Sequence, residues 1–375
     1  MSTLFTPLTL GSTTISNRLG MSALTRSRSS KTVPNDIMLK YYVQRATGGA
    51  GLIVTEGVLI TRQGSEWPEA PGIWEKSQID GWKKITDGVH NAGSKIYAQL
   101  WHLGRIAHPD APEQIAAGVP VYAPSAISAR GGKFRFLPGA PGYVKPTKIE
   151  DPTVLIAQFK EAAINAKAAG FDGVELHGAT GYLVHQFLDS ASNQRTDKWG
   201  GSPENRARFA LETLKALVEV FGPNVAVKLS PASGYNDVGM PLQDTIDTFG
   251  HLLREADKLG LAYVTFMRYV PYLDPVFDGK KRGTQHDVLS TFSPFLTKTP
   301  IFVNAGITPA EAEELVSSGK VAGVFNGVGW LTHPDFGTRI KAGKPLDNAL
   351  DFATLYGAEG VDPALGYTDY KEAVY

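Results

Sequence analysis

Eight short runs of apolar residues recur along the chain, and each is nearly continuous rather than alternating with polar positions. Strands covered on both faces have this pattern, whereas strands with one solvated face alternate. We therefore predict eight buried strands. They begin at Arg18 ("RLGMSAL"), Gly51 ("GLIVTEG"), Lys95 ("KIYAQL"), Asp172 ("DGVELHG"), Val225 ("VAVKLSP"), Ala262 ("AYVTFM"), Ile301 ("IFVNAG") and Val321 ("VAGVFNG").

Helical segments are predicted between most of these strands, and several have clear start signals. Asp151-Pro152, Ser202-Pro203-Glu204 and Thr308-Pro309-Ala310-Glu311 each combine a capping residue with proline near the first helical position. Strands that alternate with helices predict a parallel sheet, and eight such units predict a closed (β/α)8 TIM barrel. We predict one barrel domain over residues 1–375, with an open doubly wound sheet as the alternative.

Residues 101–150 interrupt the alternation of strands and helices. This segment is rich in Pro, Gly and Ala and has weak periodicity. We interpret it as a long insertion after the third strand, lying over the end of the barrel toward which the strands point. Long loops in that position often act as lids.

Composition narrows the possible functions. Basic and acidic residues balance at 37 each, which gives no electrostatic basis for binding nucleic acid or an anionic membrane. The absence of cysteine excludes disulfides and thiolate chemistry, and the eight histidines are scattered, so we predict no metal site. Rossmann, P-loop and esterase motifs are missing. No apolar run would span a bilayer and the start of the chain lacks a secretory signal, so we expect a soluble, cytoplasmic protein.

Polar residues and glycines stand where the predicted strands end. In a barrel of this type, chemistry is located at the carboxyl ends of the strands and in the loops that follow. Singly, each residue is explained as well by satisfying backbone groups at the barrel rim; together they indicate a pocket for a flat, neutral ligand with polar edges. The set is Thr25, Glu56, Gly57, Gln99, His177, Lys228, Asn304, Gly306 and Gly327.

The stretch "VELHGATGYLVHQF" carries the most specific chemistry. His177 ends a strand, Thr180 follows three residues later, and Tyr182 begins the next helical turn. An imidazole and a hydroxyl so placed can donate to one carbonyl oxygen, while Tyr182 delivers a proton as a general acid. The alternative is structural: His177 bonds a loop carbonyl and Tyr182 packs in the pocket wall.

Five long segments, spread over nearly the whole chain, match one known family. They are "LFTPLTLGSTTISNRLGMSALTR" at Leu4, "VTEG" at Val54, "AQLWHLGR" at Ala98, "HGATGYLVHQFLDSASNQRTDKWGGSPENRARF" at His177 and "HPDF" at His333. In these segments the chain resembles the Old Yellow Enzyme family of FMN-dependent ene reductases. The resemblance implies a (β/α)8 barrel in which NAD(P)H reduces FMN. Hydride then passes to the β-carbon of an α,β-unsaturated carbonyl compound, and a tyrosine protonates the α-carbon.

The resemblance also implies residue roles. Tyr182 matches the proton donor, His177 the first carbonyl-binding residue and Thr180 its partner. Thr25 matches the residue at the flavin carbonyl edge, and Gln99 matches the one that pairs with the pyrimidine ring. The implied cofactor contacts are Ala23, Thr25, Gly57, Gln99, Lys228, Gly306, Ile307, Gly327 and Val328, and the implied substrate-pocket aromatics are Trp101, Tyr235 and Tyr356.

Three positions depart from the family pattern. Thr180 replaces an Asn or His, and Lys228 replaces an Arg, which keeps the charge but loses the planar fork. Val328 stands where the family has an Arg on the cofactor phosphate, so a charge-assisted, bidentate partner is lost. At about 1.5–3 kcal/mol for each such hydrogen bond, the loss predicts roughly hundredfold weaker FMN binding. Backbone N–H groups of Gly306, Ile307, Gly327 and Val328 remain as donors.

These observations leave three hypotheses. The first, which we prefer because family membership is the stronger argument, is a reductase of α,β-unsaturated carbonyl compounds that uses FMN and NAD(P)H. The second is a flavin-independent isomerase or cyclase of a conjugated carbonyl or polyene substrate in secondary metabolism. The third is a non-catalytic scaffold, against which the arrangement of His177 and Tyr182 argues. In each case we expect a small-molecule ligand, and a monomer or homodimer.

Overall fold

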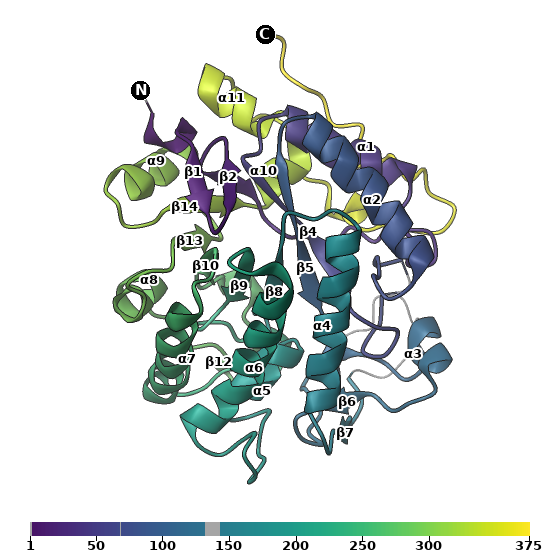
Figure 1. Cartoon of the computed structure of the whole chain (residues 1–375), viewed down its shortest axis with the longest axis vertical. Helices are drawn as coiled ribbons and strands as arrows, with labels where there is room; N and C mark the ends of the chain where they lie inside the picture. Colours follow the sequence, from purple (N-terminus) through teal and green to yellow (C-terminus); the bar gives the residue numbers. More distant parts are fainter. Residues whose placement is uncertain (1, 68, 132–142) are drawn as a thin grey trace.

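Eight parallel strands close into a barrel in the computed structural model, which describes residues 2–67, 69–131 and 143–375 (Figure 1). Val324 on the last strand lies opposite Leu19 on the first and closes the ring. The eight predicted strands and the (β/α)8 class are thereby confirmed, and the open-sheet alternative is wrong. The barrel strands are β3 (Leu19–Met21), β4 (Leu52–Leu59), β5 (Lys95–Trp101), β8 (Gly173–Gly178), β9 (Val225–Leu229), β10 (Tyr263–Met267), β13 (Ile301–Asn304) and β14 (Gly323–Asn326).

Helices surround the strands, as Figure 1 shows. Two of the three predicted caps are present: Ser202 Oγ accepts from the backbone N–H of Asn205 at 3.3 Å, and Thr308 Oγ1 accepts from that of Glu311 at 3.2 Å. The third prediction is wrong in detail, because the N-cap residue there is Pro152, which has no side-chain donor or acceptor, and Asp151 instead accepts from the N–H of Thr153 at 3.0 Å. The helices of the outer layer are α1 (Asp36–Thr47), α2 (Lys76–Asn91), α4 (Thr153–Ala168), α6 (Pro203–Phe221), α7 (Leu242–Ala256), α8 (Val288–Phe292), α9 (Pro309–Ser317) and α11 (Phe336–Ala342). Two short helices, α5 (Leu183–Leu188) and α10 (Val328–Thr332), follow β8 and β14.

The amino end of the barrel is filled. A hairpin of β1 (Leu8–Leu10) and β2 (Thr13–Ile15) lies against Asn224, just before β9 begins, through a bond from Ser12 N at 2.8 Å. Its residues Leu10 and Ile15 join inward-facing strand residues such as Tyr263 in one buried cluster. A ligand cavity in the barrel must therefore lie at the carboxyl ends of the strands.

Residues 102–172 separate β5 from β8, and they include most of the predicted insertion. The segment contains α3 (Pro112–Ala117), and β6 (Tyr122–Ala123) pairs in parallel with β7 (Thr147–Lys148), which brings its two arms together. Residues 132–142 of the insertion lie outside the described residues.

A second long connection outside the barrel, between β10 and α8, was not predicted; we call it the second excursion. It contains the antiparallel pair β11 (Val276–Phe277) and β12 (Lys280–Lys281). Asp278 and Gly279 connect them with φ values of 50° and 74°. An Asp-Gly dipeptide between two short strands is a hairpin signal, because both central residues of that turn need positive φ. The dipeptide fits this turn but does not identify it alone, because Asp80-Gly81 and Asp87-Gly88 both lie within α2.

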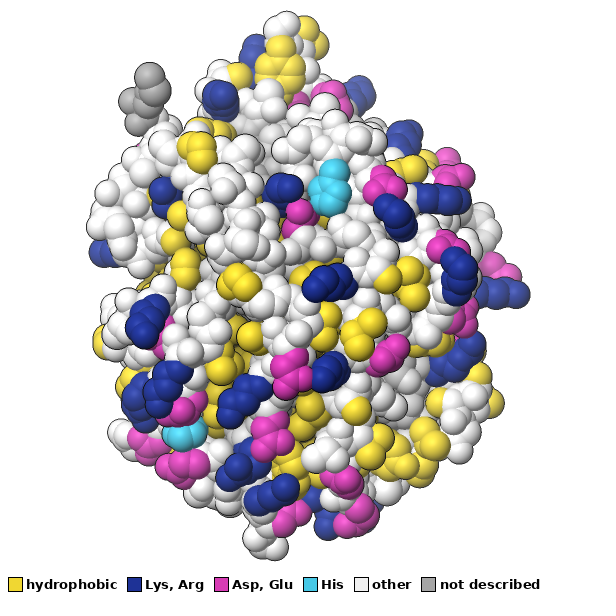
Figure 2. Space-filling model, in the orientation of Figure 1, with side chains coloured by type: hydrophobic (Ala, Val, Ile, Leu, Met, Phe, Trp, Pro, Cys, Tyr) yellow, Lys and Arg dark blue, Asp and Glu magenta, His cyan; other side chains and the backbone are white. Residues whose placement is uncertain are grey.

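The surface carries mixed charge. On the face drawn in Figure 2, Lys and Arg side chains are interspersed with Asp and Glu over the helices, in keeping with the equal counts in the sequence. That face has no extended basic patch of the kind that binds nucleic acid.

Asp237 connects three segments that lie far apart in the sequence. Its carboxylate pairs with Arg130 of the insertion and with Arg282 of the second excursion, each at 2.9 Å, and it lies itself in the loop after β9. Burial raises the pKa of Asp237, but hydrogen bonds from the two guanidinium groups more than offset that effect, so the pKa lies below its ordinary value. The carboxylate therefore stabilises the fold above about pH 4, and this contribution is lost as pH falls through the lowered pKa.

Replacing Asp237 by Asn should lower the free energy of unfolding by about 3 kcal/mol, the lower end for breaking a buried ion pair, because Arg130 is half exposed. Urea denaturation at neutral pH measures the effect. The matched control is Asp278→Asn: Asp278 lies 3.8 Å from Arg130 and its side chain is 94% exposed. That substitution should cost less than about 0.5 kcal/mol. Equal losses in the two variants would contradict a role for Asp237 as the connector.

Candidate active site

A cavity of about 690 Å³ lies at the carboxyl ends of the strands, and all eight barrel strands or the loops after them contribute to its lining. The structure brings every residue predicted for catalysis, cofactor contact or substrate contact to this one cavity, whereas Glu56, which the strand-end pattern also included, does not line it. The residues brought together are Ala23, Thr25, Gly57, Gln99, Trp101, His177, Thr180, Tyr182, Lys228, Tyr235, Gly306, Ile307, Gly327, Val328 and Tyr356.

Glu56 positions the loop that carries Thr25 rather than facing the cavity. Its carboxylate accepts from the backbone N–H groups of Arg26 at 3.0 Å and Ser27 at 3.2 Å. The register of β4 shifts between Val54 and Gly57, as at a β-bulge, which re-aims the side chains that follow. A Cβ placed on Gly57 would lie 2.5 Å from the Trp101 ring, so glycine is required here by packing.

Gln99, Glu175 and Lys228 form the polar base of the cavity. Gln99 Nε2 donates to Glu175 Oε1 at 2.7 Å, and Lys228 Nζ donates to Ser22 Oγ at 3.2 Å. Burial lowers the pKa of Lys228, and the charge of Glu175 opposes this effect. Because its amide nitrogen is engaged, Gln99 presents a carbonyl oxygen, an acceptor, near the Lys228 ammonium group, a donor. Sequence analysis missed Glu175, although a carboxylate within an apolar strand is itself unusual.

His177, Tyr182 and Trp101 form one wall of the cavity. The Tyr182 ring meets Trp101 edge-on at a centroid distance of 5.1 Å, and it meets His177 in the same way at 5.1 Å. Trp101 stacks on His177 at 6.3 Å. The three rings fix one another, so the imidazole and the phenol have defined positions on the same wall.

The protonation state of His177 follows from its surroundings. The backbone N–H of Ala179 donates to Nδ1 at 3.3 Å, which leaves the proton of the neutral ring on Nε2. Burial, assisted by the positive charge of Lys228, lowers the pKa of His177 to about 3. At neutral pH the ring is uncharged, and its Nε2–H can donate a hydrogen bond to a carbonyl oxygen.

Thr180 occupies a strained backbone conformation, with φ of 51°. Such a conformation is costly for a β-branched residue and persists where the surroundings hold it, commonly at functional sites. Ser230 Oγ accepts from Thr180 N at 2.7 Å, and Asn236 Nδ2 donates to Thr180 O at 2.8 Å. The turn between His177 and Tyr182 is therefore fixed by the loop after β9.

Buried histidines make the protein sensitive to mild acid. Burial lowers the pKa of His102 and His177 to about 3 and that of His185 to about 4, against about 6.5 in the unfolded chain. Burial also lowers the pKa of His108 and His333. Between these values the unfolded chain binds protons that the folded chain does not, so stability falls as pH drops below about 6.5.

We expect the free energy of unfolding to fall by about 1.4 kcal/mol per histidine between about pH 7.5 and 5.5. Urea denaturation at the two pH values measures the change. His185→Asn should reduce the difference by about 1.4 kcal/mol, because one of the contributing rings is then absent. A stability that does not change over this interval would contradict the neutral, buried state of these rings.

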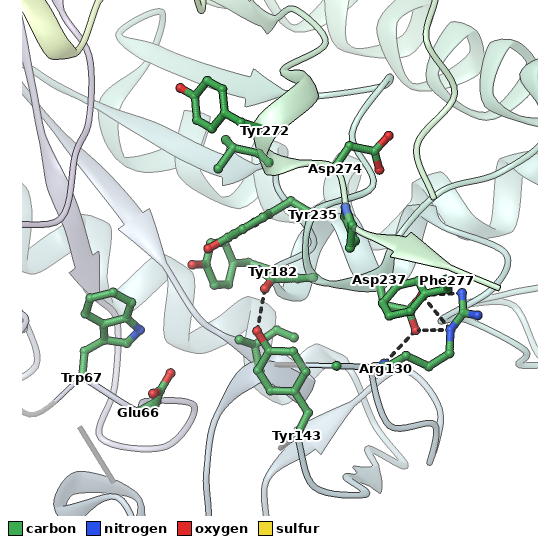
Figure 3. Close-up of a pocket in the computed structure, with 15 residues that line it drawn as sticks. Glu66, Trp67, Arg130, Tyr143, Tyr182, Tyr235, Asp237, Tyr272, Asp274 and Phe277 are labelled. Carbon is green, nitrogen blue, oxygen red and sulfur yellow. Dashed lines mark hydrogen bonds and ion pairs between the residues drawn. The ribbon is translucent and has the colours of Figure 1, made fainter. Parts of the chain in front are cut away.

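A second cavity of about 500 Å³ adjoins the first, and Tyr182 and Tyr235 line both (Figure 3). Tyr143 of the insertion also lines it, and its hydroxyl donates to Asn236 at 2.9 Å. Trp67 and Tyr272, which sequence analysis missed, lie on loops without a periodic pattern that would mark them. The two cavities therefore adjoin, and the side chains that they share are mainly aromatic.

The loops that follow β13 and β14 form one end of the larger cavity. Ala305 and Gly306 follow β13 with φ values of 83° and 66°. Asn326 Nδ2 donates to Ile307 O at 3.2 Å and so ties this loop to the one that opens α10. Within the described residues, the N–H groups of Gly306, Ile307, Gly327 and Val328 donate to no protein acceptor. Four backbone donors thus meet at one end of the cavity, as an anion site requires.

Comparison with known proteins decides the family. Residues 3–347 match the NADH:flavin oxidoreductase / NADH oxidase family. The NADP-dependent oxidoreductase lnbE of Aspergillus flavus is 37% identical over 380 residues, covering 99% of this chain and 96% of the relative. The structure of an old yellow enzyme homologue from Zymomonas mobilis superposes with a TM-score of 0.87 at 31% identity, covering 98% of this chain and 99% of that one. The chain belongs to the Old Yellow Enzyme family.

Within the Old Yellow Enzyme family, one similar relative is named as an inactive reductase. The "Probable inactive reductase easA" of Epichloe festucae var. lolii is 36% identical over 384 residues, covering 98% of this chain and 95% of the relative. Family membership confirms the sequence resemblance and makes this protein a member of an oxidoreductase family. Across residues 2–67, 69–131 and 143–375, no helix is long and apolar enough to cross a membrane, and no cluster of acidic and histidine side chains could hold a metal ion.

Proposed function

We propose that this protein reduces the carbon–carbon double bond of an α,β-unsaturated carbonyl compound with FMN and NAD(P)H. The observation that carries the proposal is the convergence of His177 and Tyr182 on one wall of a cavity whose base presents Gln99 and Lys228. A carbonyl-binding donor and a proton donor therefore border a space with flavin-complementary groups. Membership of the Old Yellow Enzyme family supports the same reaction class.

The residues around the cavity fit FMN. The free carbonyl oxygen of Gln99 is an acceptor for the ring imide N–H, and Lys228 and Thr25 are donors for the ring carbonyl oxygens. The backbone donors at Gly306 and Gly327 suit a phosphate, and the cavity of about 690 Å³ lies within the range of roughly 300–1,000 Å³ that small-molecule and cofactor sites occupy. When bound, FMN supplies the hydride that NAD(P)H delivers to it.

The protein itself supplies polarisation and a proton. His177 Nε2–H donates to the substrate carbonyl oxygen, and the Thr180 hydroxyl provides a second donor, so the oxygen is stabilised as negative charge develops on it. Because the ring of His177 is neutral, it acts here as a hydrogen-bond donor rather than as an acid. Tyr182 delivers the proton to the α-carbon.

A flavin-independent reaction is the second candidate. Val328, which is 51% exposed as a residue, stands where the family resemblance places a phosphate-binding Arg, and the similar relative easA is named as an inactive reductase. His177, Thr180 and Tyr182 suffice to polarise a carbonyl group and move a proton. That chemistry would isomerise or cyclise a conjugated carbonyl or polyene substrate without a change of oxidation state, as in secondary metabolism.

The test is a visible absorption spectrum of the purified protein followed by titration with FMN. The proposal expects a flavin band or micromolar binding, and oxidation of NAD(P)H that requires both FMN and an enone such as 2-cyclohexenone in the absence of oxygen. A colourless protein that does not bind FMN would overturn it. Conversion of a conjugated carbonyl compound without nicotinamide would then support the second candidate.

A further inference from the structure

Arg268 lies against the loop that forms the phosphate end of the cavity. It directly follows β10, and its Nε donates to Ala305 O at 3.1 Å while its backbone N–H donates to Asn304 O at 3.1 Å. A Cβ placed on Gly306 would meet Arg268 Nη2 at 4.0 Å and, among the described residues, no other non-neighbouring atom within that distance. The guanidinium group therefore lies at van der Waals distance from the side of Gly306 on which a side chain would stand, behind the residues that line the cavity itself.

The present partner of Arg268 is accessible to solvent. Nη1 and Nη2 form a forked pair with Glu311 at 2.5 and 3.1 Å, and the two side chains are 32% and 33% exposed. The forked geometry strengthens this pair, but water screens it at this exposure, so a second anion can share the guanidinium group. Glu311 lies in the first turn of α9, where the helix dipole also favours its negative charge. A phosphate with nearly two negative charges and three oxygens is a strong competitor for the guanidinium group.

Among the described residues, the nearest other cations of this part of the fold have different partners. Lys228 donates to Ser22 at the base of the cavity. Between Lys320 and Arg339 the sequence contains no Lys or Arg, and Arg339 is buried and paired with Asp335 at 2.8 Å. Arg268 is thus the guanidinium group that the fold brings to the loop at Gly306.

We infer that Arg268 is the phosphate-binding cation of this protein and replaces the Arg that the family has at position 328. The inference rests on the proposed FMN dependence. When the cofactor binds, the guanidinium group is shared between Glu311 and the phosphate, while the backbone donors of the two loops complete the contact. The strained φ of Ala305 fixes the loop carbonyl that orients Arg268.

FMN and riboflavin separate the phosphate contact from all others, because they share a ring system and differ only in the phosphate. We expect Arg268→Met to weaken FMN binding about tenfold or more, equivalent to one charge-assisted hydrogen bond, and to leave riboflavin binding within about twofold. Glu311→Gln frees the guanidinium group and should tighten FMN binding alone. Quenching of flavin fluorescence measures each affinity without requiring activity.

Arg254→Met is the matched control, because Arg254 stacks on Phe295 at the outer layer of helices and should change neither affinity. Arg268→Lys keeps the charge without the fork and should lie between wild type and Arg268→Met, which guards against misfolding of the methionine variant. Equal effects of Arg268→Met on FMN and riboflavin, or no effect on FMN, would overturn only the assignment to Arg268. Wild-type protein that binds neither flavin would overturn the proposed function and this inference together.

Discussion

The Tyr182→Phe variant should reduce an enone about 10²–10⁴-fold more slowly than the wild-type protein, the range lost with a general acid. The substitution removes only the hydroxyl group, and the ring keeps its edge-on contacts with Trp101 and His177. The cavity should therefore bind flavin and carbonyl ligands as before. Steady-state turnover of 2-cyclohexenone and flavin affinity, measured side by side, separate loss of the proton donor from loss of the site.

Tyr235→Phe is the control for Tyr182→Phe. Tyr235 lines both cavities and belongs to the loop that holds Thr180 in place, but it is assigned no proton transfer. Its variant should keep turnover within about threefold, since removing an interaction of equal strength in the ground state and the transition state changes binding rather than rate. Unchanged turnover in Tyr182→Phe would assign the proton to another donor and remove the main support for the proposed mechanism.

The fold and the composition of the cavity could be predicted for the same physical reason. Continuous apolar runs indicate strands covered on both faces, and eight alternating units close into a barrel. Closure then forces the carboxyl ends of all strands to one side, so polar residues that are far apart in sequence must meet there. That constraint brought residues as distant as Thr25, Gln99 and Gly306 to one cavity.

What the sequence did not reveal depends on contacts between loops, which have no periodicity. The orientation of Glu56 toward Arg26, and the engagement of Gln99 by Glu175, follow from a strand bulge and from packing inside the barrel. Arg268 is a different case. β10 and β13 are neighbours in the barrel, so a search for charged residues just after the strand next to the Gly306 loop would have found it.

Restoring arginine at position 328 should show whether a phosphate binds at this end of the cavity. We expect Val328→Arg to tighten FMN binding roughly a hundredfold, the equivalent of a bidentate charge-assisted contact, and to leave riboflavin binding unchanged. Val328 opens α10 and is 51% exposed as a residue, so the substitution removes little packing. Val154→Arg, at a 53% exposed position in the first turn of α4, controls for an added surface charge.

Combining Val328→Arg with Arg268→Met tests whether the two positions serve one phosphate. If they do, the cost of losing Arg268 should be smaller once position 328 carries an arginine, because residues that share one ligand are not additive. Fluorescence titration of FMN against the four variants of this cycle measures the coupling. If Val328→Arg brings no gain in FMN affinity, no phosphate lies between the two loops, and the intact His177–Tyr182 wall would then favour chemistry that needs no flavin.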